Sequence, residues 1–567
     1  MSDTPAASAV PAVPAQPAKP VNKISTKAAG LVSLAVMSSR VLGLIRDQLF
    51  AALIGAGWQM DAFVTAFRAP NLLRDLFAEG ALSTAFITTF SEKITREGDD
   101  SAWRLASKVA TLAAVFMSLV TLLGIWGAPL ITHLLAGGFN AEKMDLTVEL
   151  TRIMFPFIAL VSLAALVMGM LNAKNVFGMP AMASTFFNLG SIIGGVAFGK
   201  MLDPHFGTKH YGSGSLVGMA IGVLIGGLAQ LVVQFPSLRR VGFHFRPDFA
   251  WRDPGVRRIL LLMGPAVIAA SAVQVNVMVN GNFASHLGNG AVSWLSYAFR
   301  LMQLPIGIFG VAIGTVTLPV VSRSAAAGNT VEFRSILARG MRLAFLLTVP
   351  STVGLMMLAR PIIALIYERR AYTAEDTTHT AEALQFYAIG LCAYSGIKVL
   401  APAFYAIGKR NTPMMVSFLS IAVNYGLNQF FTFHLGWGHR GLALSTGLVA
   451  LTNFALLYWL MHTQVRRLET RQMIVTLAKL AVAGGTLALI CWAGQRWLLA
   501  GWVHQGFLVH VVLLFLLIGL AAAAFFAVAL LLRIEELDDV AALAKRKLGR
   551  LAKGRTSNTQ PPTPNIQ

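Results

Sequence analysis

The chain has 567 residues, of which 56% are hydrophobic and 13% are charged, and its formal net charge is +21. Because soluble domains carry about 25% charged residues, this composition excludes an ordinary soluble protein and indicates a helical membrane protein with many spans. The long continuous apolar runs also exclude a transmembrane barrel, whose strands alternate between apolar and polar residues.

Fourteen apolar segments, each long enough to cross about 30 Å of hydrocarbon, follow one another along the chain. Before them, residues 1–24 are rich in Ala, Pro and Val, which is typical of a disordered leader. The expected spans are residues 29–54, 60–90, 105–136, 146–171, 178–200, 213–236, 258–285, 291–319, 338–366, 380–406, 413–433, 440–462, 475–498 and 506–532. The sequence therefore predicts an all-α polytopic protein that ends in a basic tail over residues 534–567.

Positive charges interrupt the first two expected spans. This segment holds four arginines within 35 residues, and a fifth lies in the eighth span. They are Arg40, Arg46, Arg68, Arg74 and Arg300. A charge at bilayer depth costs about 2.5–3.5 kcal/mol and is rare unless it faces a cavity. Since the guanidinium fork suits carboxylate or phosphate, these residues predict a buried binding site for an anion.

Four acids in the same two spans offer the arginines a competing role, which is to form internal ion pairs that join helices. They are Asp47, Asp61, Asp75 and Glu79. On an ideal helix Arg40 and Asp47 share a face, and so do Asp61, Arg68 and Asp75. Pro70 interrupts the second stripe, so that alignment is approximate. We therefore expect Arg40 and Arg68 to be partly neutralised.

Arg300 has no acid in its own span, so it adds positive charge to any cavity that it shares with the first two spans. An uncompensated positive cavity attracts an anion. We therefore expect Arg46, Arg74 and Arg300 to be the strongest candidates for contact with a negatively charged substrate.

An internal repeat connects the two arginine-bearing regions. Ala66-Phe67-Arg68 in the second span recurs as Ala298-Phe299-Arg300 in the eighth. Both copies begin on the same side of the membrane, so the repeats are parallel, as in transporters whose halves rock against each other. The repeat predicts one lobe over residues 25–240 and a second over 241–470, with an extra helix pair over 471–533. The site is expected between the lobes.

The distribution of Lys and Arg predicts the orientation. Of the 46 basic residues, 31 fall on the side of the leader and the tail, 9 fall on the opposite side and 6 are embedded. This asymmetry predicts that both termini lie in the cytoplasm, with an even number of spans. The positive charge therefore reflects topology, and we expect no nucleic-acid partner.

Other polar residues inside the spans leave alternatives open. The seventh span is unusually polar, and its polar side chains either line the cavity or form hydrogen bonds across helices. They are Gln274, Asn276, Asn280 and Asn282. Lys398 either contributes to the cavity or extends to the cytoplasmic end of its helix, and the second reading is favoured. Pro70 and Pro305 closely follow arginines, which predicts bends beside the charges.

Motifs of enzymatic chemistry are absent from the sequence. It contains no phosphate-cradling Gly-x4-Gly-Lys-Ser/Thr loop, no Gly-x-Ser-x-Gly elbow and no His-Glu-x-x-His. His205 and His210 in a short loop give little support to a metal site, and Cys392 and Cys491 lie in apolar runs as small buried side chains. We expect a transporter without a cofactor, driven by a gradient.

Several segments resemble the MurJ (MviN) family of lipid II flippases, over roughly residues 25–530. In the first half they are Ser39-Arg40-Val41-Leu42-Gly43, Arg46-Asp47, Asp61-Ala62-Phe63, Pro70-Asn71-Leu72-Leu73-Arg74 and Phe77-Ala78-Glu79-Gly80-Ala81. In the second half they are Met263-Gly264-Pro265-Ala266, Arg300-Leu301, Gly310-Val311-Ala312, Leu318-Pro319 and Ala401-Pro402.

The resemblance implies the fold of the multidrug/oligosaccharidyl-lipid/polysaccharide (MOP) exporters, with fourteen helices in two lobes. It implies that the protein moves lipid II, an undecaprenyl-pyrophosphate-linked disaccharide-pentapeptide, across the bacterial inner membrane for peptidoglycan synthesis. It assigns cavity roles to Arg40, Arg46, Arg74 and Arg300, and implicates Asp61, Arg68 and Glu79. It also gives the last two helices a groove for the lipid tail. We expect a monomer that contacts membrane lipids and cell-wall synthesis proteins.

Two residues depart from the pattern of the family. Phe299 stands where its members often have Asp, and Asp75 stands where they often have a second basic residue. A cationic cavity suggests alternating access, in which the arginines engage the pyrophosphate and the lobes then reopen outward. The alternatives are export of another lipid-linked oligosaccharide or of small molecules on the same fold, and a membrane scaffold for cell-wall enzymes.

Overall fold

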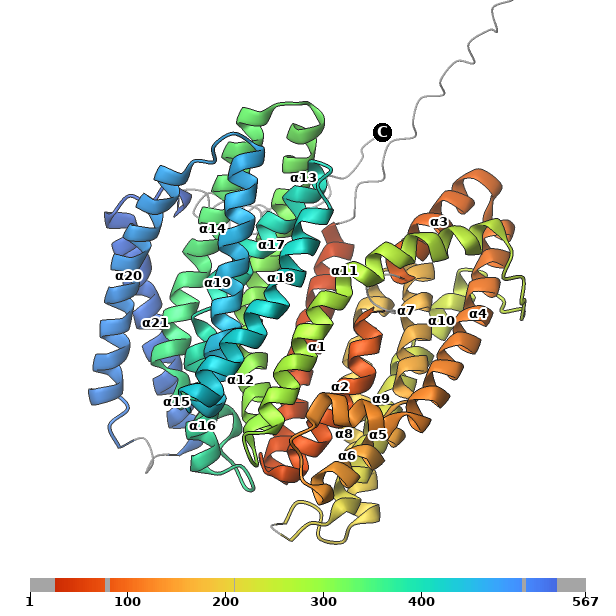
Figure 1. Ribbon diagram of the computed structural model, residues 1–567, viewed down its shortest axis with the longest axis horizontal. Helices are drawn as coiled ribbons and strands as arrows, with labels where there is room; N and C mark the ends of the chain where they lie inside the picture. The colour runs from red at the N-terminus through yellow and green to blue at the C-terminus, as the bar shows by residue number, and fades with distance from the viewer. Residues whose placement is uncertain (1–25, 77–81, 209, 502–505, 538–567) are drawn as a thin grey trace, which may run out of the picture.

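A computed structural model describes residues 26–76, 82–208, 210–501 and 506–537, and these residues are helical with no β-strand (Figure 1). We call α1–α10 the first half and α11–α21 the second half. The first half comprises α1 (Thr26–Ile54), α2 (Trp58–Arg74), α3 (Ser83–Glu97), α4 (Asp99–Trp126), α5 (Ala128–Ala136), α6 (Ala141–Met154), α7 (Phe157–Ala173), α8 (Gly178–Leu202), α9 (Ser213–Val232) and α10 (Phe235–Arg240).

The second half begins after a loop of irregular structure. It comprises α11 (Pro254–Ser285), α12 (Ala291–Pro305), the π-helix η2 (Ile306–Gly310), α13 (Val311–Ala326), α14 (Thr330–Met357), α15 (Ala359–Tyr367), α16 (Ala374–Ala388), α17 (Leu391–Ala406), α18 (Asn411–Asn428), the π-helix η3 (Gln429–His434), α19 (Gly438–Gln464), α20 (Thr470–Trp497) and α21 (Phe507–Leu531).

Each expected span overlaps one helix or a run of consecutive helices. However, fewer than fourteen of the described helices are long and apolar enough to cross a membrane. Among the described residues, nine helical stretches are long and apolar enough to cross a membrane, and two bent helix pairs raise the number to eleven. Helices α1 and α2 fall outside this set. Helix α2 has 17 residues, fewer than the about 20 that a helix needs to cross a membrane.

The helices gather in two groups that meet along α1, α2, α11 and α12 (Figure 1). In the first half α8 packs on α1 and α9, and α2 packs on α6. In the second half α14 packs on α17 and α20, and α20 packs on α21. Helix α2 contacts α12, and α11 contacts α5, so the two groups share an interface.

The helices that carry the repeated triplets end beside their charges. Helix α12 ends at Pro305 and continues as η2, which widens the backbone turn before α13 begins. Proline has no N–H to donate, and π-helical turns are frequent at functional sites. Helix α2 runs through Pro70 and ends at Arg74. A π-helical segment therefore follows Arg300 within the continuous helical stretch Ala291–Ala326, and Pro70 lies inside α2. The bends that the prolines predict stay a prediction.

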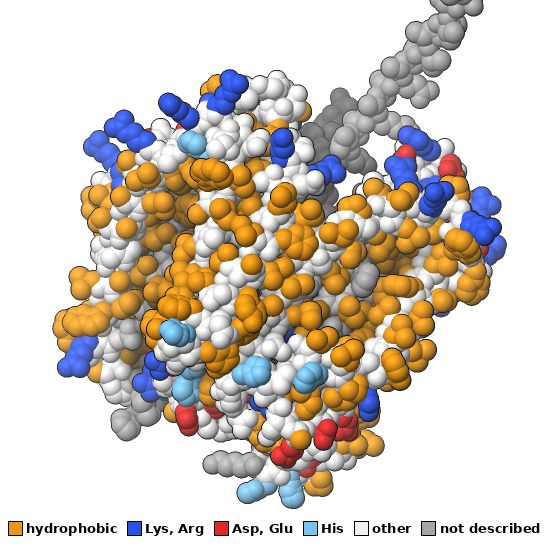
Figure 2. Space-filling view, in the orientation of Figure 1, with side chains coloured by type: hydrophobic (Ala, Val, Ile, Leu, Met, Phe, Trp, Pro, Cys, Tyr) orange, Lys and Arg blue, Asp and Glu red, His pale blue; other side chains and the backbone are white. Residues whose placement is uncertain are grey.

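The surface pattern is that of a membrane protein. Large apolar side chains are exposed along many helices, for example Leu122, Val316 and Leu516 at 65%, 74% and 50%. Figure 2 shows this apolar surface between two ends, with Lys and Arg gathered at the upper end, near the junctions α3–α4 and α13–α14. Apolar side chains exposed in this number are stable only against lipid.

Candidate functional site

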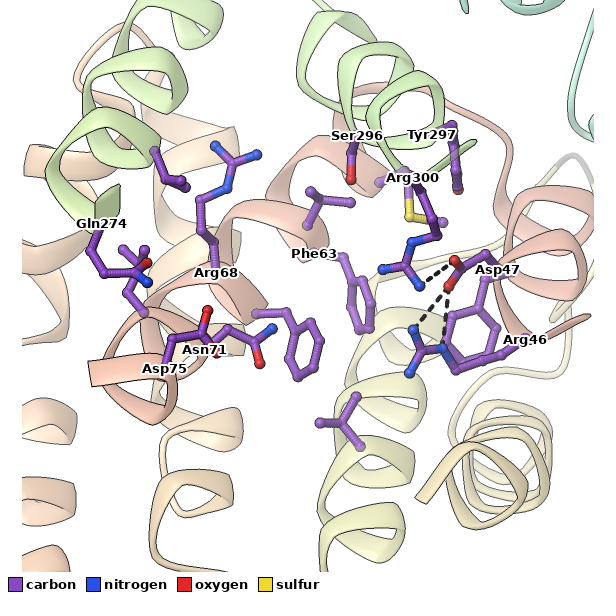
Figure 3. A pocket seen from close by; sticks show the side chains of 17 residues that line it. Arg46, Asp47, Phe63, Arg68, Asn71, Asp75, Gln274, Ser296, Tyr297 and Arg300 are labelled. Carbon is purple, nitrogen blue, oxygen red and sulfur yellow. Dashed lines mark hydrogen bonds and ion pairs between the residues drawn. The ribbon is translucent and has the colours of Figure 1, made fainter. Parts of the chain in front are cut away.

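A cavity of about 220 Å³ lies at the interface between the two halves (Figure 3). Helices α1, α2 and α9 line it from the first half, and α11 and α12 line it from the second. Its charged lining residues are Arg46, Asp47, Arg68, Asp75 and Arg300. Three arginines and two aspartates give this lining a formal charge of +1.

Asp47 connects the two halves at one wall of the cavity. Its Oδ1 atom accepts a hydrogen bond from Nη2 of Arg46 at 3.0 Å, and its Oδ2 atom lies 2.5 Å from Nη1 of Arg300. The side chains of Arg46 and Asp47 are 8% and 10% exposed, whereas that of Arg300 is 42% exposed. A guanidinium has five N–H donors, so Arg300 keeps donors that face the cavity (Figure 3).

Arg68 lies on the other side of the cavity from Arg300, close to Gln274 (Figure 3). Within the described part of the chain, no carboxylate lies within ion-pair distance of Arg68. Its guanidinium packs closely on α11, because a Cβ atom added to Gly281 would lie 2.4 Å from Nη1 of Arg68. Arg68 therefore forms no ion pair with Asp61 or Asp75, and each of these acids has another partner.

Asp61 forms a fully buried junction between the halves, away from the cavity. Its Oδ2 atom accepts hydrogen bonds from Nζ of Lys143 and from the backbone N–H of Gly290, both at 2.7 Å. Its Oδ1 atom accepts from the N–H and the hydroxyl of Ser293, at 2.8 and 2.7 Å. The carboxylate thus satisfies backbone donors at the start of α12, which a helix N-terminus leaves unpaired.

Arg74 and Arg40 do not line the cavity. Nη2 of Arg74 lies 2.8 Å from Oδ1 of Asp75, which does line it. Arg40 packs on η2, because a Cβ atom added to Gly307 would lie 2.2 Å from its Nη1 atom. The expected pair of Arg40 and Asp47 does not form, since Asp47 binds the neighbouring Arg46 and the distant Arg300.

The polar residues of α11 divide between the two roles that the sequence left open. Gln274 lines the cavity. The three asparagines form hydrogen bonds across helices instead: Asn276 donates to Ser420 at 3.0 Å, Asn280 to Thr446 at 3.2 Å and Asn282 to the carbonyl of Leu134 at 3.2 Å. Lys398 is exposed on α17 and is not part of the cavity lining. Glu79 lies outside the described residues.

Both residues that depart from the family pattern contact other side chains in the structure. Phe299 packs edge-on against Tyr387, with ring centroids 5.3 Å apart. Asp75 pairs with the residue that precedes it and so adds no free charge. Sequence reasoning missed Lys143, whose side chain is 4% exposed, because its acidic partner lies 82 residues away in the chain.

Comparison with known proteins gives consistent results. Residues 50–518 match the family described as lipid II flippase MurJ. The lipid II flippase MurJ of Burkholderia cenocepacia is 38% identical over 433 residues, which are 75% of this chain and 82% of that protein.

Two solved structures are similar to the chain. One is a lipid II flippase MurJ in an inward closed conformation, with a TM-score of 0.68 and 26% identity, covering 88% of this chain and 99% of that one. The other is an inward-facing multidrug resistance MATE transporter of the MOP superfamily, with a TM-score of 0.59 and 15% identity over 77% of this chain and 94% of that one. The second similarity concerns the fold alone.

Proposed function

Because the chain belongs to the MurJ family of lipid II flippases, we propose that its arginine-lined cavity binds the pyrophosphate of lipid II during transport. The protein is a multi-pass membrane flippase and not an enzyme. In this proposal the cavity is the transport site, and its side chains bind and release the substrate without forming or breaking covalent bonds.

The observation that carries this proposal is the meeting of Arg46, Arg68 and Arg300 in one cavity, with two of them from the first half and one from the second. Two of these arginines share one carboxylate and the third has none among the described residues. An incoming pyrophosphate completes the charge balance and accepts several hydrogen bonds at once.

The mechanism that we propose is alternating access. The bound anion attracts Arg46 and Arg68 of the first half and Arg300 of the second, so it favours a state in which the halves lie closer around it. The Asp61 junction joins the halves at the start of α12, and its hydrogen bonds must break before that end opens. The transition therefore exchanges contacts at Asp61 for contacts with the substrate.

The membrane arrangement is also part of the proposal. We propose fourteen crossings, in which two consecutive short helices together form one broken span. Six crossings lie in residues 25–240, six in 241–470 and two in 471–533. The gathering of Lys and Arg at one end supports an orientation in the bacterial inner membrane with both termini in the cytoplasm (Figure 2). Exposed apolar side chains on α20 and α21, such as Leu489 and Phe515, support a groove for the lipid tail.

A direct test is native mass spectrometry of the purified protein in the presence of lipid II and an excess of ordinary phospholipid. We expect the wild-type protein to retain lipid II, and a variant with Arg46→Gln, Arg68→Gln and Arg300→Gln to lose it while still binding phospholipid. Lys398→Gln removes one positive charge outside the cavity and is the matched control. Equal retention of lipid II by all three proteins would rule out the proposed role of the cavity.

A further inference from the structure

A second group of polar side chains lies in the second half, outside the transport cavity. His379 and Glu382 are on α16, and His439 is at the start of α19. One ligand atom from each of the three lies within 4.8 Å of the other two. Their side chains are 29%, 22% and 12% exposed, respectively.

The two imidazole nitrogens converge on one carboxylate oxygen. Nδ1 of His379 lies 3.6 Å and Nε2 of His439 lies 3.3 Å from Oε2 of Glu382. Both nitrogens are buried, and neither has a hydrogen-bond partner among the described residues. Buried polar atoms are nearly always satisfied, so two unsatisfied nitrogens aimed at one point indicate a missing ligand there.

The separations suit a zinc ion. Zinc binds imidazole nitrogen and carboxylate oxygen at about 2.0–2.2 Å in a tetrahedral arrangement, which places neighbouring ligand atoms about 3.3 Å apart. Two of the three separations in the group already match this value closely. Two imidazoles with one carboxylate are a ligand set that zinc uses in proteins, with water in the fourth position.

Neighbouring side chains supply the outer contacts that such a site needs. Nε2 of His379, the ring nitrogen that does not face the group, lies 3.8 Å from Oε1 of Glu375. A small movement of this exposed acid lets it accept a hydrogen bond from that nitrogen and fix the direction of the imidazole. Arg440 donates to both oxygens of Glu382, at 2.9 and 2.6 Å, and fixes the direction of the carboxylate. Oε2 of Glu382 retains a second lone pair for the metal.

We propose that His379, Glu382 and His439 form a binding site for a divalent transition metal, with zinc as the preferred ion, that joins α16 to α19. This site does not depend on the pyrophosphate site. The indole of Trp294 lies beside both imidazoles, with ring centroids 4.3 Å from His379 and 5.5 Å from His439. Trp294 is on α12, next to Ser293 of the Asp61 junction, so bound metal also stiffens the helix that carries Arg300.

The test is calorimetric titration of the purified, tag-free protein with Zn²⁺, together with metal analysis after dialysis. We expect one zinc site in the wild-type protein that is weakened about tenfold or more by His379→Gln or His439→Gln. His434→Gln is the matched control, because His434 is exposed in the same half and lies outside the group. It should bind zinc as the wild type does.

Two further measurements separate metal binding from misfolding. Saturating Zn²⁺ should raise the thermal unfolding temperature of the wild type and of His434→Gln but not of His439→Gln. Co²⁺ in place of Zn²⁺ should give the strong visible absorption of a four-coordinate site only where both histidines remain. If the wild type takes up no more zinc than the double variant His379→Gln/His439→Gln, with both proteins folded by size-exclusion chromatography, the site does not exist.

Discussion

Replacement of Arg68 by glutamine isolates one cavity arginine from the ion pairs around it. Among the described residues Arg68 has no carboxylate partner, so the substitution releases no acid into the cavity. By contrast, Arg46 and Arg300 share the carboxylate of Asp47, so substitution of Arg46 also changes the environment of both of these residues. Arg68→Gln therefore removes one cationic donor group and little else.

The expected size of the effect follows from the contacts that Arg68 can make. A hydrogen bond to a charged group contributes about 1.5–3 kcal/mol, and about 1.4 kcal/mol corresponds to a tenfold change in affinity. We therefore expect Arg68→Gln to bind a polyprenyl pyrophosphate about 10- to 150-fold more weakly than the wild type. Without ligand, the variant should be at least as stable thermally, because it no longer holds an unpaired charge beside the cavity.

The assay is a fluorescence or calorimetric titration of the protein in detergent with a short-chain polyprenyl pyrophosphate, at two salt concentrations. Lys398→Gln is the control, since Lys398 is exposed on α17 and its loss changes the net charge by the same amount. The control should bind as the wild type does, and wild-type binding should weaken at high salt. If Arg68→Gln and Lys398→Gln both bind within twofold of the wild type, Arg68 does not contact the anion.

Two further predictions concern the interface between the halves. In Gly281→Ala the new methyl group would meet Nη1 of Arg68 at 2.4 Å, so the displaced guanidinium should weaken pyrophosphate binding with no change of charge. Gly485→Ala, which has open space around its Cβ, is its control, and equal binding by the two would contradict the close contact. Asp61→Asn leaves the buried ammonium of Lys143 without its counter-charge and should lower stability by about 3–5 kcal/mol, measured as a drop in thermal unfolding temperature. The double variant Asp61→Asn/Lys143→Met should recover part of this loss. If it recovers none, the unpaired ammonium of Lys143 is not the cause of the lower stability.

The sequence predicted the helical membrane class and the resemblance to the MurJ family, and the comparisons confirm the family. Hydropathy and motif identity depend on local residues, so they are readable without a structure. The repeat of Ala-Phe-Arg also predicted that Arg68 and Arg300 approach one interface, and the structure brings both into one cavity.

The ion pairs were not predictable in the same way. Helical periodicity favoured partners seven residues apart, but long flexible side chains allowed Arg46 and Arg74 to bind the acids next to them. The partner of Asp61 is Lys143, and the two are joined only by the packing of α2 on α6. Tertiary packing of this kind leaves no periodic pattern in the sequence.

The histidine group was missed for a related reason. His379 and Glu382 share a face of α16, but their third member, His439, lies on another helix 60 residues after His379. The sequence drew attention instead to His205 and His210, which are close in the chain. Among the described residues, those two histidines do not belong to a group with metal-binding geometry.

The most direct test of the central claim is the exposure of lipid II on the outer leaflet of bacterial cells depleted of their own flippase. We expect the wild-type chain and Lys398→Ala to restore this exposure. We expect Arg46→Ala, Arg68→Ala and Arg300→Ala to abolish it, although each variant is inserted in the membrane at wild-type levels. Full restoration by all three cavity variants would contradict the claim that this cavity carries the pyrophosphate.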